Sequence, residues 1–573
     1  MVTRRAGLCA LRSRMAAPWR WLTTVAGASS SVTLPGGSAY QYTYTAQTGQ
    51  VASITAPGGE TLDESWDGFL NTQTQWVGPV AGTVSRTFDD NFRVTALSVD
   101  GTATNYAYDA DGLLTEAGSL GVTRDAQNGR ITATSDGDVT TARTYDGFGG
   151  VVSLDANNST NPLYQARYTR DADGRITQAV IDENGVTTTW GYTYDARGRL
   201  ATVSENGSVV DTYGYDGNGN RVSVNGQTVA TYNADDQLTS YHGVAYTYAP
   251  DGSLAGAGGT TYRYDALGHL LEVKTPTETI TYTYDGLGRR VGKAVNGTPV
   301  QGFLYEGIHP IAELDGQGNV VATFVYGTRP NVPDLMIKGG VTYRIISNDL
   351  GSPVEVADTT TGAIVEQLSY DVWGTITSDS NPGFQPFGFA GGLYDADTGL
   401  VHFGARDYDP AIGRWTTRDP LGFAGGDTNL YGYVLQDPVN FDDPLWTFQL
   451  GLSFNFQFLG VLNVNFGAGL VIDGHGDIGT YRYGQFAGGV GEDAGAGLSF
   501  GVSNANCIED LGGPFANSSA ALGEGLQGSV DTFSGHGSHG QVVTGGGFTA
   551  GVGAGADWAM GVSQTHVTPL FSP

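Results

Sequence analysis

The chain has 573 residues, 40% of them hydrophobic and 11% aromatic, so it can bury a large core and is not a disordered protein. A net charge of −30 opposes binding to the phosphates of nucleic acid, which requires clustered lysine and arginine, so we expect no nucleic-acid partner. With 88 glycines, 30 tyrosines and only 15% charged residues, the composition predicts an all-β protein in which tight turns join aromatic strands.

Residues 1–31 form a basic N-terminal segment with five arginines and no acidic residue. We expect this segment to be disordered or to act as a weak signal peptide. Because its apolar run, Trp21–Ala28, is short and directly follows Arg20, an arbitrary start within a longer gene is favoured over a true signal. No stretch of the sequence has the length that a transmembrane helix needs.

Residues 32–370 repeat one phrase, in which two tyrosines precede Asp-x-x-Gly, at a spacing of about 20 residues. Well-preserved copies are YAYDADGLL from Tyr106, YTYDARGRL from Tyr192, YGYDGNGNR from Tyr213, YRYDALGHL from Tyr262 and YTYDGLGRR from Tyr282. Alternate residues of a strand share a face, so Tyr-x-Tyr places both rings on one side of a sheet. The Asp-x-x-Gly predicts a type I turn whose glycine takes a positive φ and closes a hairpin.

The repeated aspartates are therefore expected to build turns rather than to catalyse a reaction. An arginine that follows the glycine, as at Arg199 and Arg289, is expected to pair with the aspartate of a neighbouring turn. A single unit of this kind cannot bury its aromatic face, so successive units must stack into an extended antiparallel sheet. An open propeller or a solenoid is the alternative arrangement of such strands.

Residues 371–446 end the array with a different motif, GARDYDPAIGRWTTRDPLGFAGGDTNLYGYVLQDPVNFDDP from Gly404. Together with the repeats, this motif resembles the Rhs/YD-repeat family and its RHS repeat-associated core, over roughly Tyr40 to Leu445. The resemblance implies a spirally wound sheet that forms a hollow shell or a partial shell. It also implies that the core segment closes one end, as in teneurins and in the C component of insecticidal toxin complexes.

The resemblance further implies that the core is an aspartyl autoprotease, which cuts just after a PxxxxDPxG motif and releases the tail. Pro438 and the run Asp443-Pro444-Leu445 match this motif, but Trp446 stands where the glycine belongs. Either one residue is missing and Trp446 precedes the cut bond, or the cleavage motif is broken. The expected cleavage region is Leu445, Trp446 and Thr447.

Autoproteolysis of this kind needs two carboxylates that share a proton, one acting as base toward water and one as acid. Asp419 and Asp443, 24 positions apart, are the residues that match the family, and Arg406 or Arg414 would hold one carboxylate ionised. From the residues alone, each Asp-Pro pair is better explained as the start of a turn, and only the resemblance gives the catalytic interpretation equal weight. Both interpretations remain open at this stage.

Residues 447–573 lack the repeat phrase and are predicted to form a separate Gly-rich β domain. Apolar and polar residues alternate over Phe448–Phe458 and Leu462–Phe466, which predicts two amphipathic strands. A soluble domain is favoured over a membrane-spanning sheet. The four tail histidines, His475, His536, His539 and His566, lack the spacing of a zinc motif, so we predict no metal site and no cofactor. One arginine and no lysine against nine acidic residues disfavours a nuclease.

Two classes of function fit these features. In the first, the chain is a polymorphic-toxin shell, secreted or at the cell surface, that encloses its own C-terminal domain as cargo. Such a protein would have a cognate immunity protein and a partner in a secretion machine or toxin complex. In the second, it is a noncatalytic cell-surface or secreted scaffold in which the tail is a terminal domain. Cleavage of the chain near Leu445 is expected only in the first class, so the presence or absence of a cut distinguishes the two functions.

Overall fold

The computed structural model describes residues 20–23, 29–183, 185–420, 422 and 427–442, together with the backbone of six strands between Thr447 and Phe571. The chain divides into two compact units. The first comprises residues 1–144, 151–420 and 429–442, and the second comprises residues 145–150, 421–428 and 443–573. Within the described residues, no helix is long and apolar enough to cross a membrane.

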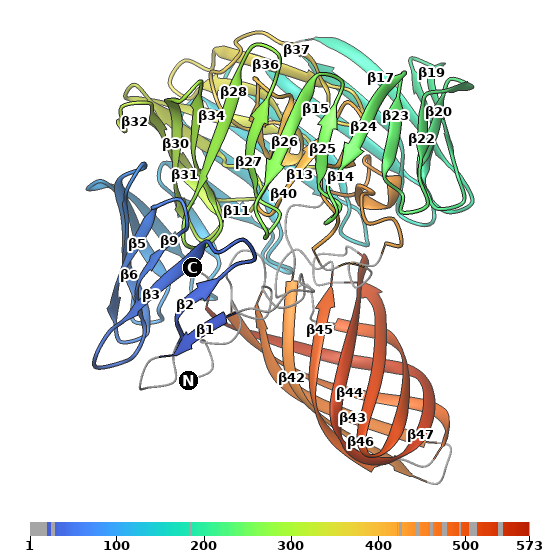
Figure 1. The fold of residues 1–573 in the computed structure, drawn as a ribbon. Coiled ribbons are helices and arrows are strands. Elements are labelled where there is room, and N and C mark those ends of the chain that lie inside the picture. Colours follow the sequence, from blue (N-terminus) through green and yellow to red (C-terminus); the bar gives the residue numbers. More distant parts are fainter. Residues whose placement is uncertain are drawn as a thin grey trace. The chain divides into compact units, whose positions relative to one another are not determined.

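The first unit contains a sheet of 21 strands, drawn in Figure 1 from blue to green. Its strands are β1 (Arg20–Thr23), β2 (Ser29–Thr33), β3 (Ala39–Tyr44), β4 (Val51–Thr55), β5 (Thr61–Asp67), β6 (Leu70–Val77), β7 (Gly82–Phe88), β8 (Val94–Val99), β9 (Thr102–Tyr108), β10 (Leu114–Ala117), β11 (Leu120–Arg124), β12 (Ile131–Asp136), β13 (Val139–Tyr145), β14 (Val151–Asn157), β15 (Pro162–Arg170), β16 (Ile176–Glu183), β17 (Val186–Tyr194), β18 (Leu200–Glu205), β19 (Ser208–Tyr215), β20 (Arg221–Val224) and β21 (Gln227–Thr228). Strand β1 lies within the basic N-terminal segment and pairs with β2.

A second sheet of 16 strands continues the array. Its strands are β22 (Ala230–Tyr232), β23 (Leu238–Tyr241), β24 (Val244–Tyr248), β25 (Leu254–Ala257), β26 (Thr260–Tyr264), β27 (Leu270–Lys274), β28 (Thr279–Tyr284), β29 (Arg290–Val295), β30 (Thr298–Glu306), β31 (His309–Asp315), β32 (Val320–Val325), β33 (Leu335–Lys338), β34 (Val341–Ser347), β35 (Pro353–Asp358), β36 (Ile364–Tyr370) and β37 (Ile376–Asp379). Long continuous sheets exclude the propeller, whose strands form separate four-stranded blades.

The turns of the repeats have the predicted structure. At Asp195, the carbonyl oxygen accepts the N–H of Gly198 at 2.9 Å, and Gly198 has a φ of +83°. The carboxylate of Asp195 also accepts the N–H groups of Arg197 at 2.8 Å and Arg199 at 3.1 Å. The register of β17 and β18 shifts beside the turn, between Thr193 and Tyr194, so each hairpin closes through a bulge. The expected role of Asp-x-x-Gly is confirmed.

The predicted ion pair between these arginines and the aspartate side chain of a neighbouring turn is wrong, although Arg199 Nη1 does donate to the main-chain oxygen of Asp216 in the next turn at 3.3 Å. Arg199 pairs with Asp195 of its own turn at 2.6 Å, and its guanidinium lies 4.5 Å from the ring centre of Tyr215. The Asp195 carboxylate accepts both the main-chain N–H and Nε of Arg199, so the side chain lies against its own turn. The Tyr215 hydroxyl in turn donates to the carbonyl oxygen of Leu200 at 2.7 Å, so each repeat is joined to the next. Arg93, Arg175 and Arg289 form the same pair with the aspartate four residues earlier.

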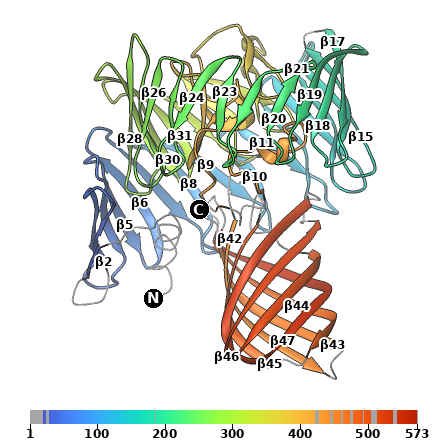
Figure 2. The same ribbon diagram turned by 45° about the vertical axis from the view of Figure 1, so that its right-hand side comes forward.

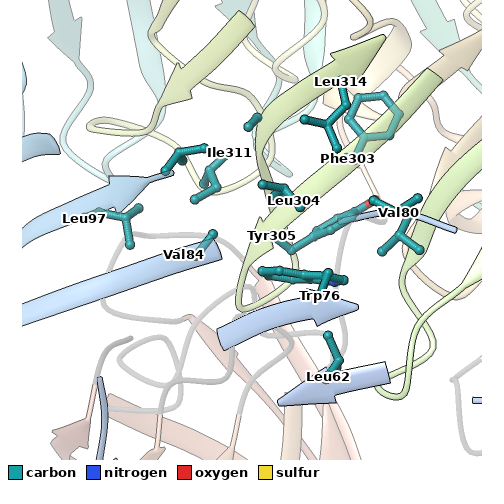
Figure 3. Close-up of a cluster of buried hydrophobic side chains, with 13 residues drawn as sticks. Leu62, Trp76, Val80, Val84, Leu97, Phe303, Leu304, Tyr305, Ile311 and Leu314 are labelled. Carbon is teal, nitrogen blue, oxygen red and sulfur yellow. The ribbon is translucent and has the colours of Figure 1, made fainter. Parts of the chain in front are cut away.

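Strands more than 200 residues apart in the chain pack on one another. Trp76 Nε1 donates to the Asp285 carboxylate at 3.2 Å across 209 residues, and Arg86 Nε donates to Glu306 at 2.8 Å across 220 residues. Figure 3 shows the buried cluster at this junction, where Leu62 and Trp76 of the first sheet face Leu304 and Tyr305 of the second. The predicted all-β class with a spirally wound antiparallel sheet is confirmed.

Gly137 lies at another junction between the two sheets and provides a test of this winding. It has a φ of +54°, and a Cβ at this position would lie 2.1 Å from the carbonyl oxygen of Thr359. The next residue, Asp138, donates its N–H to the same oxygen at 2.6 Å. We expect Gly137→Ala to lower the unfolding free energy by about 3 kcal/mol, since it adds a backbone clash to the cost of a positive φ.

Gly207→Ala is the matched control for this substitution. Gly207 has a φ of +84° in a comparable hairpin, but nothing lies within 4 Å of its Cβ position. This variant should lose only about 1 kcal/mol, the usual cost of a left-handed alanine. Urea unfolding of the two proteins measures the difference. Equal losses would mean that the contact with Thr359 does not hold the sheets together.

The core segment forms a small four-stranded sheet in the first unit, with strands β38 (Leu393–Asp395), β39 (Leu400–Phe403), β40 (Arg406–Asp409) and β41 (Arg414–Trp415). The short 3-10 turns η1 (Phe389–Gly391) and η3 (Val434–Gln436) flank it. Its aromatic cluster includes Phe389, Phe403, Tyr408, Trp415 and Tyr433. Leu400 packs against Leu270, Val273 and Ile280, so the small sheet rests on β27 and β28.

The second unit consists of a six-stranded sheet in the order β44-β43-β42-β45-β47-β46, with an additional pairing of β44 and β47. The strands are β42 (Thr447–Phe458), β43 (Leu462–Ile472), β44 (Ile478–Gly491), β45 (Ala494–Ser503), β46 (Gly513–His536) and β47 (Val542–Phe571). Figure 2 shows them as long arrows coloured orange to red. The two amphipathic strands predicted from the sequence fall within β42 and β43. The domain limits 32–370, 371–446 and 447–573 stay predictions.

Candidate active site

Arg406 and Asp419 lie together in the core segment. Arg406 begins β40, and its guanidinium lies 3.9 Å from the ring centre of Trp415. Its Nη1 atom is 3.5 Å from Oδ2 of Asp419, and the two side chains are 4% and 13% exposed. Asp419 is fixed through its main chain, because its N–H donates to the carbonyl oxygen of Leu430 at 2.8 Å. The Asp419 carboxylate is thus paired with the buried guanidinium of Arg406, which itself packs on the ring of Trp415.

Arg414, the other arginine considered from the sequence, joins the core to the repeats. Its Nη1 donates to the side-chain oxygen of Asn220 at 2.7 Å, and its Nη2 donates to the carbonyl oxygen of Asp236 at 2.6 Å. The guanidinium also lies 4.8 Å from the ring centre of Tyr232. Arg406 is therefore the arginine that we assign to the Asp419 carboxylate.

The second predicted carboxylate, Asp443, lies outside the described residues, as do Leu445 and Trp446. Thr447 begins β42, of which only the backbone is described. The described chain of the first unit reaches Asp442, whose Oδ2 accepts a hydrogen bond from Asn331 Nδ2 at 3.1 Å. The approach of Asp419 and Asp443, and the catalytic roles of both, stay predictions.

A buried charged group on the other face of β40 could not be found from the repeat pattern. Asp407 accepts a hydrogen bond from Arg290 Nη2 at 2.7 Å, and Nδ1 of His402 lies 3.2 Å from the same oxygen. Arg290 also donates to the Tyr284 hydroxyl at 2.9 Å. The one signal in the sequence is the second arginine of YTYDGLGRR, because the turn itself needs only Arg289.

The electrostatics of this group follow from burial. Burial, together with the charge of Arg290, lowers the pKa of His402 to about 4, so the imidazole is neutral at physiological pH. Burial raises the pKa of Asp407, but Arg290 and His402 outweigh it and hold that pKa below its usual range. The shell therefore holds β40 in place through an ionised pair, Arg290 and Asp407, directly behind Arg406.

A second ion pair joins the first strand of the core sheet to the repeats. The Tyr282 hydroxyl donates to Oδ2 of Asp395 at 2.6 Å, and Lys293 Nζ donates to Oδ1 at 2.7 Å. Lys293 also pairs with Asp397 at 2.6 Å. The core sheet is thus attached to β28 and β29 at both β38 and β40.

Among the described residues, no three histidine, cysteine, aspartate or glutamate side chains gather in a way that could hold a metal ion. The side chains of the four tail histidines lie outside the described residues.

Tyr-x-Tyr strands, Asp-x-x-Gly turns, spiral packing and an attached core segment together define a YD-repeat shell protein. The family model described as the teneurin YD-shell matches residues 26–439, and the chain belongs to this family. The resemblance to Rhs and YD-repeat proteins is therefore confirmed.

Several known proteins are similar to parts of this chain. It is 34% identical to Teneurin-3 of Danio rerio over 271 residues, which cover 44% of this chain and 10% of that protein. It is 32% identical to the tRNA nuclease WapA of Bacillus subtilis (strain 168) over 258 residues, or 42% of this chain and 11% of that protein. The match thus spans about a tenth of the length of these relatives.

Among solved structures, a crystal structure of TcdB2-TccC3 superposes with a TM-score of 0.55 and 17% sequence identity. The match covers 74% of this chain and 28% of that one. At this identity the similarity shows the fold alone.

Proposed function

We propose that this chain is a shell protein that carries its own C-terminal domain, residues 447–573, as cargo and frees it by cutting itself near Leu445–Thr447. The observation that carries the proposal is the Arg406–Asp419 pair, a nearly buried carboxylate in the core segment. The change of compact unit between Asp442 and Asp443 supports it, because it lies within a few residues of the proposed cut, which would free residues 447–573 from the rest of the chain.

The proposed chemistry uses Asp419 and Asp443 as a pair. Two nearby carboxylates cannot both ionise readily, so one keeps its proton near neutral pH. The ionised member accepts a proton from water as the water oxygen bonds to the peptide carbonyl carbon, while the protonated member gives its proton to the carbonyl oxygen. The C–N bond then breaks, the leaving nitrogen takes the proton held by the first carboxyl, and the second carboxylate regains its proton from the hydroxyl that becomes the new carbonyl. The Arg406 guanidinium favours the ionised form of Asp419, which assigns Asp419 as the base and Asp443 as the acid.

Replacing either aspartate by asparagine is expected to abolish cleavage. Asn has nearly the same volume as Asp but cannot share a proton, so the loss should exceed about 1000-fold in rate. Intact-mass measurement of the purified proteins should give two fragments for the wild type, whose masses place the cut bond between Leu445 and Thr447. Asp419→Asn and Asp443→Asn should each give one uncut chain.

Asp409→Asn is the matched control, since Asp409-Pro410 is another Asp-Pro pair of the core segment and Asp409 ends β40. Its carboxylate accepts the N–H of Ala411 at 3.0 Å, a turn contact that asparagine can keep. This variant should be cut like the wild type. Cutting that persists in both Asp419→Asn and Asp443→Asn would remove these residues from catalysis.

The cargo half of the proposal concerns what the second unit does after release. We expect expression of residues 447–573 alone in bacteria to arrest growth, and a cognate immunity protein to relieve that arrest. The single arginine and the absence of lysine in this segment argue against a nucleic-acid target. A secreted or cell-surface location, with a partner in a secretion machine or toxin complex, is part of the same proposal. Normal growth would contradict an effector role.

A second candidate function rests on Trp446, which stands where the family motif has glycine. A bulky residue at that position hinders close approach of the backbone to the site. In this case the protein is a noncatalytic surface scaffold, and its wild-type chain stays whole. The mass measurement therefore decides between the two functions.

A further inference from the structure

The chain that leads into Asp443 is attached to the shell on both sides of Phe441. Asn440 provides one attachment and Asn331 provides the other, through Asp442. The two asparagines come from different parts of the chain, one from the core segment and one from the loop between β32 and β33.

Asn440 uses both ends of its amide. Its side-chain oxygen accepts the N–H of Ile176 at 2.7 Å, and its Nδ2 donates to the Tyr194 hydroxyl at 2.8 Å. Nδ2 also lies 2.8 and 2.9 Å from the two carboxylate oxygens of Asp437. Tyr194 itself donates to the carbonyl oxygen of Ile176 at 2.5 Å. The Asn440 amide therefore bridges the start of β16, at Ile176, and the end of β17, at Tyr194.

Asn331 holds the chain two residues further on. Its Nδ2 lies 3.1 Å from Oδ2 of Asp442, 2.9 Å from the carbonyl oxygen of Leu350 and 3.0 Å from that of Ala390. A Cβ on Gly391 would lie 2.1 Å from the main-chain oxygen of Asn331, so the backbones are in close contact here. Asn331 therefore has little freedom to follow Asp442 if that residue moves.

The chain enters this segment through a turn that L-residues rarely adopt. Val434, Leu435 and Gln436 have φ values of +40°, +56° and +65°. Tyr433 before the turn is 0% exposed and Asp437 after it is 2% exposed, so both ends are buried. Such a backbone persists only where the surroundings fix it, and such strain is concentrated at functional sites.

We propose that Asn440 and Asn331 are positioning residues, which fix the path of the chain into Asp443 and so place the Leu445–Thr447 backbone for cleavage. This inference rests on the proposed autoproteolysis. Neither asparagine takes part in the chemistry. Together with the left-handed turn, they hold residues 437–442 against the shell.

The test compares Asn440→Leu and Asn331→Leu with the control Asn158→Leu. Leucine has a similar size but forms no hydrogen bonds. Asn158 is a fair match, because its Nδ2 donates to Gly362 at 3.0 Å and its oxygen accepts two N–H groups, far in sequence from the core segment. Each protein is made by cell-free translation, so that the chain starts uncut, and fragment masses are followed in time at 20 °C. Unfolding curves first show that every variant is folded at this temperature.

We expect at least tenfold slower cutting in Asn440→Leu and Asn331→Leu, and an unchanged rate in Asn158→Leu. A purely stabilising role would leave the rates of folded proteins unchanged. If the two variants are folded and cut at the wild-type rate and bond, the inference is overturned.

An exchange of charge provides a rescue experiment. Asn440→Asp keeps the acceptor for Ile176 but places a second carboxylate against Asp437, so it should also cut at least tenfold more slowly. In Asp437→Asn/Asn440→Asp the new amide can donate to the new carboxylate. We expect the double variant to recover to within threefold of the wild type, and a rate that stays at the Asn440→Asp level would count against the assigned contact.

Hydrogen–deuterium exchange separates this inference from the proposed function. In full-length Asp419→Asn protein, Asn440→Leu should speed exchange in peptides covering Ile176 and residues 438–442, while Asn158→Leu should not. If the wild type is never cut, autoproteolysis fails but exchange still decides whether the asparagines hold the chain. Unchanged exchange in these peptides would overturn the inference.

Discussion

Replacing Arg290 by methionine is expected to lower the unfolding free energy of the shell by about 3–5 kcal/mol, which is the usual cost of breaking a buried ion pair. Arg290 and Asp407 are 6% and 2% exposed, and their charged atoms are 2.7 Å apart. Without the guanidinium, the Asp407 carboxylate stays buried and loses its ion-pair partner, with His402 left beside it. In the wild type the guanidinium lies 4.0 Å from the ring centre of Tyr282, and methionine keeps an apolar side chain over this ring. The loss of unfolding free energy therefore comes mainly from the missing charge of Arg290. Urea unfolding at pH 7 measures it.

Arg263→Met is the control for this prediction. Arg263 forms a 3.6 Å pair with Glu272, but its side chain is 58% exposed, so its removal should cost less than about 1 kcal/mol. A second test is Arg290→Met/Asp407→Leu. Removing both charges should recover most of the loss, because no unpaired carboxylate remains. Equal losses in Arg290→Met and Arg263→Met would show that the buried pair does not hold the core segment.

The local structure of the shell could be predicted because the residues of each repeat determine its turn without contacts from elsewhere. Asp195 and Gly198 define a turn whatever surrounds them, since their geometry is set within five residues. The pairing of Arg199 was predicted wrongly for a related reason. The Asp195 carboxylate accepts the main-chain N–H of Arg199 and so brings that side chain to its own turn, which sequence spacing alone does not reveal.

Contacts between distant repeats could not be predicted from the sequence. Nothing in the repeat phrase says that Trp76 meets Asp285, because this contact depends on how far the sheet turns over many strands. The same limit applies to the candidate site. The core motif indicated Asp419 and Arg406, whereas nothing in the sequence showed which distant residues Arg290, Asn331 and Asn440 contact across the winding.

The stability of the wild-type protein is expected to fall between about pH 4.5 and pH 8, and Glu366→Gln should remove part of this dependence. Glu366 lies on β36 and is 1% exposed. Burial, with the nearby charge of Asp379, raises its pKa to about 8, and Gln385 and Lys338 offset this only in part. The folded state therefore prefers a protonated Glu366. Its contribution is fully present below the unfolded pKa near 4.5 and is lost as pH rises to the folded pKa.

Glutamine imitates the protonated form at every pH, so the two proteins should be equally stable near pH 4.5 and differ by up to about 4 kcal/mol near pH 8.5. Thermal unfolding of both proteins from pH 5 to pH 9 measures this difference. Comparing them at each pH cancels other titrating groups, including His402, whose lowered pKa acts in the opposite direction at acidic pH. As a control, Glu205→Gln changes an exposed residue on β18, and its stability should differ from that of the wild type by the same amount at every pH. A constant gap between wild type and Glu366→Gln would mean that Glu366 is ionised in the folded protein throughout this range.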